Sequence, residues 1–365
     1  MVTPRKALFS ADVFYMQPAL EAQELWRKAR FYLPYYYETG MLYAESKGMA
    51  QDFLERYRSL NVTPASEIFT VEESKSRWGG VLCSALWDGI SQTYFNPRSG
   101  SGDGDGALRS IIQASIDEGA TYQQAPVSTL IIDENMSCRG VRLEDGSELN
   151  VDHVIVAAGA WAPKFLADSA PENNNSLQVG GRMIAAGAIQ CSATFPTDQA
   201  EKLKDAPVIF NAMTHTEGES ITPRPDGKLK FNYERSFTNY EIHQSGEKIS
   251  GLKDEIHTVV KHTYDNWIHG LKIKNYRMCW DAATPNQGWI IAPQPHCEGL
   301  YIASDGSFHS WKFMPILGRC VVQMLLGELD SVKESRWAWD RDDAGGALPE
   351  YQYLPSRDLK EIQGY

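Results

Sequence analysis

Hydrophobic and polar positions near the C-terminal end of the chain predict two short strands followed by a helix. Trp289–Ala292 and Leu300–Ala303 are apolar runs bounded by turn residues, and the small, polar segment Ser304–Ser310 follows the second run. From Lys312, apolar residues recur at helical spacing until Gly327. A strand, a tight loop and a helix in this order gather backbone N–H groups that bind electron-rich ligands, although an ordinary strand–helix unit gives the same pattern.

The same periodicities predict helices and strands along the rest of the chain. Helices are predicted over residues 15–31, 48–60, 106–119 and 252–267. Strands are predicted over residues 35–44, 120–124, 127–132, 151–161, 184–191, 208–210 and 229–233, with a hairpin turn at Asp145-Gly146. A polar break at 168–176 marks a candidate domain boundary.

Composition and charge narrow the classes of function. The chain has 365 residues, of which 42% are hydrophobic and 11% aromatic, as is typical of a globular protein large enough for two domains. The formal net charge of −12 argues against nucleic-acid binding, which needs a basic face. Since no apolar run approaches the ~20 residues that cross a bilayer, we expect no membrane partner.

The cysteines argue against metal chemistry. Six cysteines are scattered without Cys-x-x-Cys or zinc-type spacing, so no metal site is expected, and a reducing, cytoplasmic compartment is the default. Cys83, Cys138, Cys191 and Cys320 have apolar neighbours and are expected to be small buried residues. Nothing in the sequence distinguishes a monomer from an oligomer.

Two stretches resemble one family of flavoenzymes. Cys279 lies shortly before a Thr-Pro turn, and Ser307, His309 and Lys312 follow the second predicted strand. This arrangement resembles the flavin-contacting segment of the monomeric sarcosine oxidase and fructosyl-amino-acid oxidase (amadoriase) family, whose later motif is Gly-x-Ser-Gly-His-Gly-Phe-Lys. The Tyr-Tyr-x-Glu-Thr-Gly sequence at residues 35–40 is similar to another segment of that family.

The resemblance implies a cofactor, FAD, and residues that contact it. In the family, the cysteine is bonded through sulfur to the 8α-methyl of FAD, which places that role on Cys279. Ala158 and Gly159, at the end of a β-branched strand, would bring backbone up to the nucleotide, and Ser307, His309 and Lys312 would lie over the flavin. From the residues alone, a buried inert thiol at Cys279 and an ordinary hydrogen-bonding histidine at His309 remain alternatives.

The resemblance also implies residues for catalysis and substrate binding. Lys230 matches the family lysine that activates O2 near the flavin, where a cation stabilises anionic oxygen species. Lys312 matches the lysine that pairs with the substrate carboxylate, and Trp311 beside it would line the pocket. The alternatives are a solvated strand lysine at Lys230, a lysine stem packed on the core at Lys312, and a core tryptophan at Trp311.

The sequence departs from the family pattern in two places. Phe308 and Ser310 stand where the motif has glycines, so backbone that lies close to a ring must accommodate side chains. Residues 1–60 contain no Gly-x-Gly-x-x-Gly turn for the FAD pyrophosphate. The run Gly100–Gly106 carries two aspartates, which would repel a pyrophosphate, so we interpret it as a loop near the active site or a helix-entry turn.

The predicted fold is therefore α/β, a D-amino-acid-oxidase-like FAD-binding fold that lacks its first βαβ unit and carries an inserted, largely antiparallel substrate sheet. We assign residues 1–34, 85–165 and 279–345 to the FAD-binding domain, 35–84 and 166–278 to the substrate domain, and 346–365 to a C-terminal tail.

The predicted function is oxidation of a secondary amine, either an N-substituted or a fructosyl amino acid, with O2 reduced to H2O2. Three explanations of the unmatched first unit stay open: a shortened oxidase chain, a natural protein that binds flavin weakly, or a protein that has lost flavin. In the last case the pocket would bind an amine or carboxylate, with a non-redox step or none.

Overall fold

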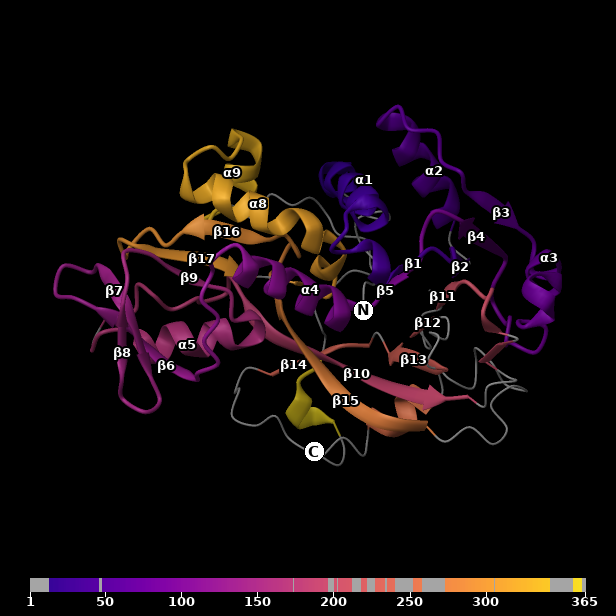
Figure 1. Ribbon diagram of the computed structural model, residues 1–365. Coiled ribbons are helices and arrows are strands. Elements are labelled where there is room, and N and C mark those ends of the chain that lie inside the picture. The colour runs from indigo at the N-terminus through magenta and orange to yellow at the C-terminus, as the bar shows by residue number, and fades with distance from the viewer. Residues whose placement is uncertain are drawn as a thin grey trace.

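The structure is a computed structural model whose strands form four sheets within the described residues (Figure 1). The described residues are 13–45, 48–172, 174–195, 200–201, 203–211, 218–221, 227–233, 235–239, 252–257, 273–304, 306–341 and 357–362. The helices are α1 (Val13–Lys28), α2 (Met49–Ser59), α3 (Val71–Ser76), α4 (Gly104–Asp117), α5 (Ala162–Ser169), α8 (Met314–Leu325) and α9 (Ser331–Trp337). The 3₁₀ turns are η1 (Leu33–Tyr35), η2 (Trp78–Gly80), η3 (Gly159–Trp161), η4 (Ser310–Phe313) and η6 (Leu359–Glu361).

A three-layer unit is built on a small sheet of order β16–β17–β9, formed by Ile290–Pro293, Leu300–Ser304 and Val154–Val156. Trp289 and Ile291 pack against α1, α8 and α9 on one face. The other face packs against α5 and the hairpin of β6 (Val127–Ile132) and β7 (Cys138–Leu143), which β8 (Glu148–Asn150) extends. Figure 1 shows α8 and α9 lying over β16 and β17. This alternation of helix and sheet layers is typical of an α/β domain.

The large sheet has nine strands in the order β14–β10–β13–β12–β11–β2–β4–β3, with β15 along the other edge of β10. Its pairs are antiparallel except β11 with β2, which confirms the expected largely antiparallel sheet. Figure 1 shows β10 and β15 running together as its longest strands. The strands are β2 (Met41–Glu45), β3 (Glu67–Phe69), β4 (Gln92–Asn96), β10 (Ile184–Thr194), β11 (Val208–Asn211), β12 (Gly218–Ile221), β13 (Lys228–Tyr233), β14 (Phe237–Thr238) and β15 (Ile273–Ala283).

The two faces of the large sheet differ in chemistry. One face is the largest apolar core and contains Leu42, Ile209, Phe231 and Ile189. At the β11–β2–β4 end of the opposite face, a second apolar cluster that includes Phe210 packs under α2. Successive side chains along a strand point to opposite faces of the sheet. At the β13–β10–β15 end, the residues that alternate with those of the largest apolar core therefore point to this second face.

Most predicted elements are present, and three expectations about local structure are wrong. Residues 120–124 form no strand, because they are exposed and pair with no neighbour. Strand β15 was missed, since its alternation is broken at Asn275, where φ is 52° and the pairing register with β10 shifts. Cys83 is exposed rather than buried. Of the predicted helix 252–267, residues 252–257 are helical, and the remainder lies outside the described residues.

The large sheet extends past both expected limits of the substrate domain. β4 follows residue 84 and still pairs with β2 and β3. β15 begins before residue 279 and continues to Ala283 as one strand. Strand β15 therefore spans the expected boundary at residue 279 between the substrate domain and the FAD-binding domain.

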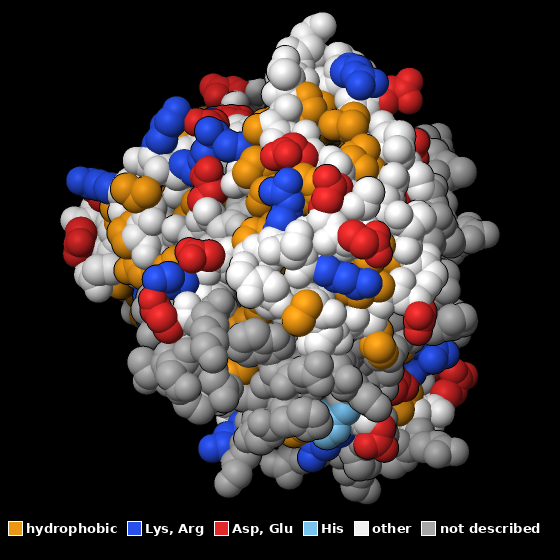
Figure 2. All heavy atoms as spheres, turned by 90° about the vertical axis from the view of Figure 1, so that its right-hand side faces the viewer, with side chains coloured by type: hydrophobic (Ala, Val, Ile, Leu, Met, Phe, Trp, Pro, Cys, Tyr) orange, Lys and Arg blue, Asp and Glu red, His pale blue; other side chains and the backbone are white. Residues whose placement is uncertain are grey.

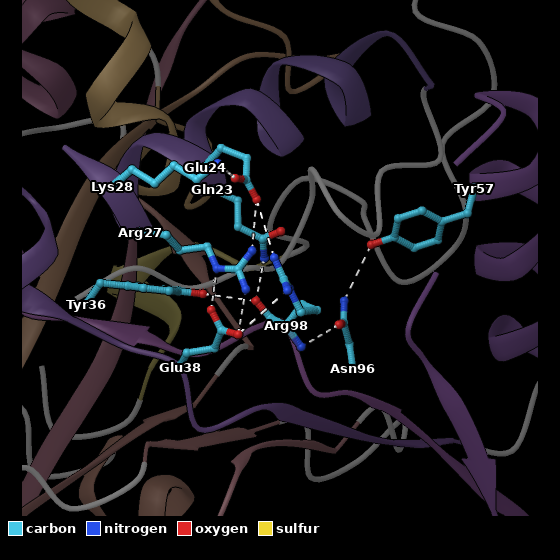
Figure 3. Close-up of polar contacts among 9 residues, drawn as sticks. All are labelled: Gln23, Glu24, Arg27, Lys28, Tyr36, Glu38, Tyr57, Asn96 and Arg98. Atoms are coloured by element: carbon cyan, nitrogen blue, oxygen red, sulfur yellow. Dashed lines mark hydrogen bonds and ion pairs between the residues drawn. The ribbon is translucent and has the colours of Figure 1, made fainter. Parts of the chain in front are cut away.

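A polar cluster fastens α1 to β1 (Tyr36–Tyr37) and to the loop that precedes β5 (Ser101–Gly102), as Figure 3 shows. Arg27 binds both oxygens of Glu38, with Nη2 donating to Oε1 at 2.7 Å, and this carboxylate raises the pKa of the guanidinium. The Tyr36 hydroxyl and the Gln23 amide both donate to the carbonyl oxygen of Arg98. These contacts fix the position of the first helix against the rest of the chain.

The face shown in Figure 2, which includes α2 and α3, carries Lys and Arg side chains interspersed with Asp and Glu. Mixed charge of this kind is typical of a solvated surface. Within the described residues, no helix is long and apolar enough to span a membrane.

Candidate functional site

The parallel strands β9 and β17 end at the same edge of the small sheet, and this edge forms one wall of the candidate site. Ala158 and Gly159 follow β9 after one residue, Ala157, and Ser304 ends β17. Gly159 has φ of 54°, and a Cβ atom placed there would meet no atom within 4 Å. The backbone at this edge is therefore open to a ligand, as expected where parallel strands of an α/β sheet end.

The end of β15 lies against the turn that follows β17. The backbone N–H of Ser307 donates to the carbonyl oxygen of Ala282 at 2.8 Å, and the N–H of Phe308 donates to Oδ2 of Asp281 at 2.6 Å. Cys279 is two residues before Asp281 and therefore points to the same face of the sheet. The structure thus brings Ser307 and Phe308 against the end of the strand that carries Cys279.

Lys312 and His309 are both buried beside this turn. Lys312 is 5% exposed, its Nζ lies 5.8 Å from the centroid of the Phe313 ring, and its carbonyl oxygen accepts from Nε1 of Trp26. Nε2 of His309 lies 2.9 Å from the carbonyl oxygen of Gln287, which can only accept, so this nitrogen carries the proton. Both side chains are buried, and the burial of Lys312 argues against the role of an ordinary solvent-exposed lysine.

Lys230 lies on the same face of the large sheet as Cys279. Its register partner on β10 is Ser192, and that of Cys279 is Ala188, so all four side chains point to one side. From strand rise and spacing, the Cα atoms of Lys230 and Cys279 are roughly 16 Å apart. Lys230 is partly buried. A cation and a thiol therefore line the half of this face that α2 does not cover.

Cys279 differs from most other thiols of the chain in its surroundings. Cys138, Cys191, Cys297 and Cys320 are buried, whereas Cys279 is partly exposed. Burial raises the pKa of Cys191 to about 12 and that of Cys297 to about 11, which makes these thiols poor nucleophiles. Cys279 is accessible at the position where the resemblance places attachment.

The other sequence predictions near this site have mixed outcomes. Trp311 is 46% exposed and lies at the outer side of η4, so it is not part of the apolar core. Asp103 caps α4 and a Cβ on Gly106 would lie 2.5 Å from the Tyr35 ring, which confirms that this glycine-rich run is a helix-entry turn. Asp281 was not predicted, although an acidic residue inside the Cys-Trp-Asp-Ala-Ala strand was a visible signal.

Comparison with known proteins identifies the class to which this site belongs. A family model described as FAD dependent oxidoreductase matches residues 11–324. The chain therefore belongs to this family, and it is an FAD-dependent oxidase of the amine- and amino-acid-oxidising kind. This confirms the expected cofactor family and the expected fold class at that level.

Individual relatives are distant but cover most of the chain. It is 22% identical to the L-saccharopine oxidase of Schizosaccharomyces pombe over 371 aligned residues, which cover 93% of this chain and 82% of that protein. It is also 22% identical to the monomeric sarcosine oxidase of a Bacillus species, over 85% of this chain and 78% of that protein.

Solved structures show the same fold. A thermally stable mutant of fructosyl peptide oxidase has a TM-score of 0.81 at 18% identity, covering 100% of this chain and 87% of that chain. The fructosamine oxidase (Amadoriase II) of Aspergillus fumigatus has a TM-score of 0.79 at 20% identity, covering 97% of this chain and 84% of that one.

The residues of the candidate site fit a flavin. Open space over Gly159 allows a ring system to approach the backbone, and the accessible thiol of Cys279 is aligned with the adjoining turn. Lys312 supplies a buried cation next to that turn, where an electron-rich ring or a carboxylate is stabilised. The arrangement is compatible with the predicted flavin-binding roles of Ala158, Gly159, Cys279, Ser307, His309 and Lys312.

Proposed function

We propose that this protein oxidises the C–N bond of an N-substituted amino acid, a secondary amine that carries a carboxylate, with O2 as the electron acceptor. The observations that carry the proposal are the shared sheet face of Cys279 and Lys230 and the burial of Lys312, which follows the turn that Asp281 contacts. Distant relatives named for oxidation of saccharopine, sarcosine and fructosyl peptides support this substrate class.

The chain's own residues bind and orient the substrate in this proposal. Lys312 pairs with the substrate carboxylate, because a buried cation binds an anion more strongly than an exposed one does. This contact fixes which carbon beside the nitrogen faces the flavin. Trp311, at the outer side of the same turn, shields the bound amine from water.

A bound flavin would supply the acceptor for a hydride equivalent from the carbon beside the amine nitrogen, with O2 as the final acceptor and H2O2 as the product. Lys230 places a cation on the sheet face where oxygen is reduced, and it stabilises negative charge that develops on oxygen. Its position on a paired strand, rather than on a loop, keeps this charge in a fixed place.

Cys279 is proposed to hold the cofactor through a thioether bond between its Sγ and the 8α carbon of the flavin. Forming this bond from a thiol and a methyl group releases two protons and two electrons, and O2 is the oxidant.

The test is an absorption spectrum of the purified full chain before and after acid precipitation, with FAD supplied. We expect the yellow colour to stay with the wild-type pellet and to move to the supernatant for Cys279→Ser. Cys83→Ser is the matched control, because that thiol is also accessible but lies outside the site. Yellow colour that stays in the Cys279→Ser pellet would refute covalent attachment at Cys279. Wild-type protein that takes up no FAD would refute the proposed function.

Substrate binding is tested by H2O2 release from N-methyl, fructosyl and N-carboxyalkyl amino acids. Lys312→Met should lower kcat/KM for carboxylate-bearing amines by roughly 10- to 100-fold, the worth of a hydrogen bond to a charged group. Lys164→Met, which changes an exposed lysine paired with Asp168, should have no effect. Lys230→Met should slow reoxidation by O2 while anaerobic reduction by substrate keeps its rate.

A further inference from the structure

The turn between β17 and η4 holds two consecutive residues in the left-handed region of backbone conformation. Ser307 has φ of 38° and Phe308 has φ of 63°. Each non-glycine residue in this region is disfavoured roughly 5- to 30-fold relative to its ordinary conformation. Such a turn persists only where neighbouring groups hold it.

The Asp281 side chain contacts this turn beside the carbonyl oxygen of Ala282, which accepts from the N–H groups of Gly306 and Ser307. Its Oδ2 accepts from the N–H of Phe308 at 2.6 Å, and its Oδ1 accepts from the N–H of Ala282 at 2.9 Å. A Cβ on Gly306 would lie 2.0 Å from Oδ1 and 2.2 Å from Oδ2, so the carboxylate fills the space that glycine leaves. Both carboxylate oxygens of Asp281 therefore lie in close contact with the Gly306–Phe308 backbone.

What the turn positions is the buried part of the site. His309 follows directly as the first residue outside η4, and Lys312 lies within η4. Asp281 is two residues after Cys279 on the same strand and face. One strand thus carries both the candidate attachment residue and the anchor of the segment that carries Lys312.

We propose that Asp281 is a positioning residue whose carboxylate holds Ser307 and Phe308 in their left-handed conformation and so sets the place of Lys312 relative to Cys279. The role of Lys312 rests on the proposed function, whereas the coupling of Asp281 to the turn is a property of the chain itself. The charge on Asp281 strengthens its bond to the Phe308 N–H beyond that of a neutral acceptor.

The primary test is hydrogen exchange of the full chain, read in peptides that cover residues 306–313. Asp281→Ala should speed exchange in this segment by roughly 10- to 100-fold, because a hydrogen bond to a charged acceptor is lost, while the β6–β7 hairpin keeps its rate. Adding Phe308→Gly should restore part of the protection, since glycine adopts positive φ without a clash. Such rescue is not expected if Asp281 merely supports the fold.

Asn61→Gly is the matched control for this rescue. Asn61 also has positive φ, at 55°, but it follows α2 and is exposed. In the Asp281→Ala background it should restore no protection at residues 306–313. If Phe308→Gly restores none either, or if Asp281→Ala leaves the segment unchanged, the proposal is overturned. Should Asp281→Ala not fold, Asp281→Asn with and without Phe308→Gly gives the same comparison.

A second readout separates this proposal from the proposed function. With a working substrate, Asp281→Ala should raise KM for carboxylate-bearing amines, in the same direction as Lys312→Met, and Phe308→Gly should reverse part of the rise. Loss of exchange protection without any change in KM would overturn the link to Lys312. Absence of oxidase activity in the wild-type chain would overturn the proposed function. The hydrogen-exchange result would then still test whether Asp281 holds the turn.

Discussion

The carboxylate of Glu45, fully buried at the end of β2, offers a quantitative test of how the large sheet is joined to α2. It accepts from the N–H groups of Met49 at 2.5 Å and Ala50 at 3.1 Å, and from the Gln92 amide at 2.7 Å. Gly48, at the start of α2, has no side chain to cap the helix. Glu45 therefore takes the place of the cap and lies at the positive end of the helix dipole.

Replacing Glu45 by alanine should destabilise the protein by about 3–5 kcal/mol, because two buried N–H groups and the partly buried Gln92 amide lose a charged acceptor at once. Glu45→Gln keeps one acceptor but turns an N–H group toward a donor, so we expect a loss of about 1–3 kcal/mol. In thermal unfolding followed by circular dichroism, the alanine variant should lose roughly 4–7 °C.

The control for this prediction is Glu73→Ala. Glu73 also accepts two bonds at a helix start, from the N–H of Thr70 at 2.7 Å and from its hydroxyl at 2.9 Å, but it is exposed. Water replaces those bonds, so its loss should be much smaller. If the two alanine variants unfold at similar temperatures, burial is not the reason for the strength of the Glu45 contacts, and the reasoning is refuted.

Two further predictions concern glycine and a helix cap. Gly187→Ala should cost about 1–3 kcal/mol in chemical denaturation, since the new Cβ would lie 2.5 Å from the Phe237 ring, whereas Gly318→Ala, in open space within α8, should stabilise by about 0.5–1 kcal/mol; equal effects would contradict the packing argument. A bond to the Lys333 side chain lowers the pKa of Asp330 in the folded state, so its small contribution is present above the unfolded pKa of about 3.9 and is lost as pH falls further. Asp330→Asn should therefore be slightly less stable than wild type at pH 6, and the gap should narrow as pH falls below the unfolded pKa; a gap that widens in acid would contradict this sign.

The sequence by itself determined the elements with strong periodicity and the family signature. The runs that became β16, β17 and α8 are apolar at regular spacing, so local burial alone defines them. The residues of the C-terminal motif, with Cys279 before a Thr-Pro turn, pointed to flavin chemistry through their resemblance to the flavin-contacting segment of the sarcosine oxidase and amadoriase family. These patterns arise from residues that are close together in sequence, so the sequence alone is enough to predict them.

Only the tertiary structure decided which residues meet. The hydrophobic pattern of β15 is weak, and the segment becomes a strand because it pairs along β10. The free energy of this pairing comes from residues distant in sequence, so a short stretch of sequence does not reveal it. That pairing puts Cys279 and Lys230 on one face and brings Asp281 under the turn at Phe308. The turn keeps a left-handed backbone without the expected glycines because a carboxylate from another strand holds it, and such long-range compensation is invisible in sequence.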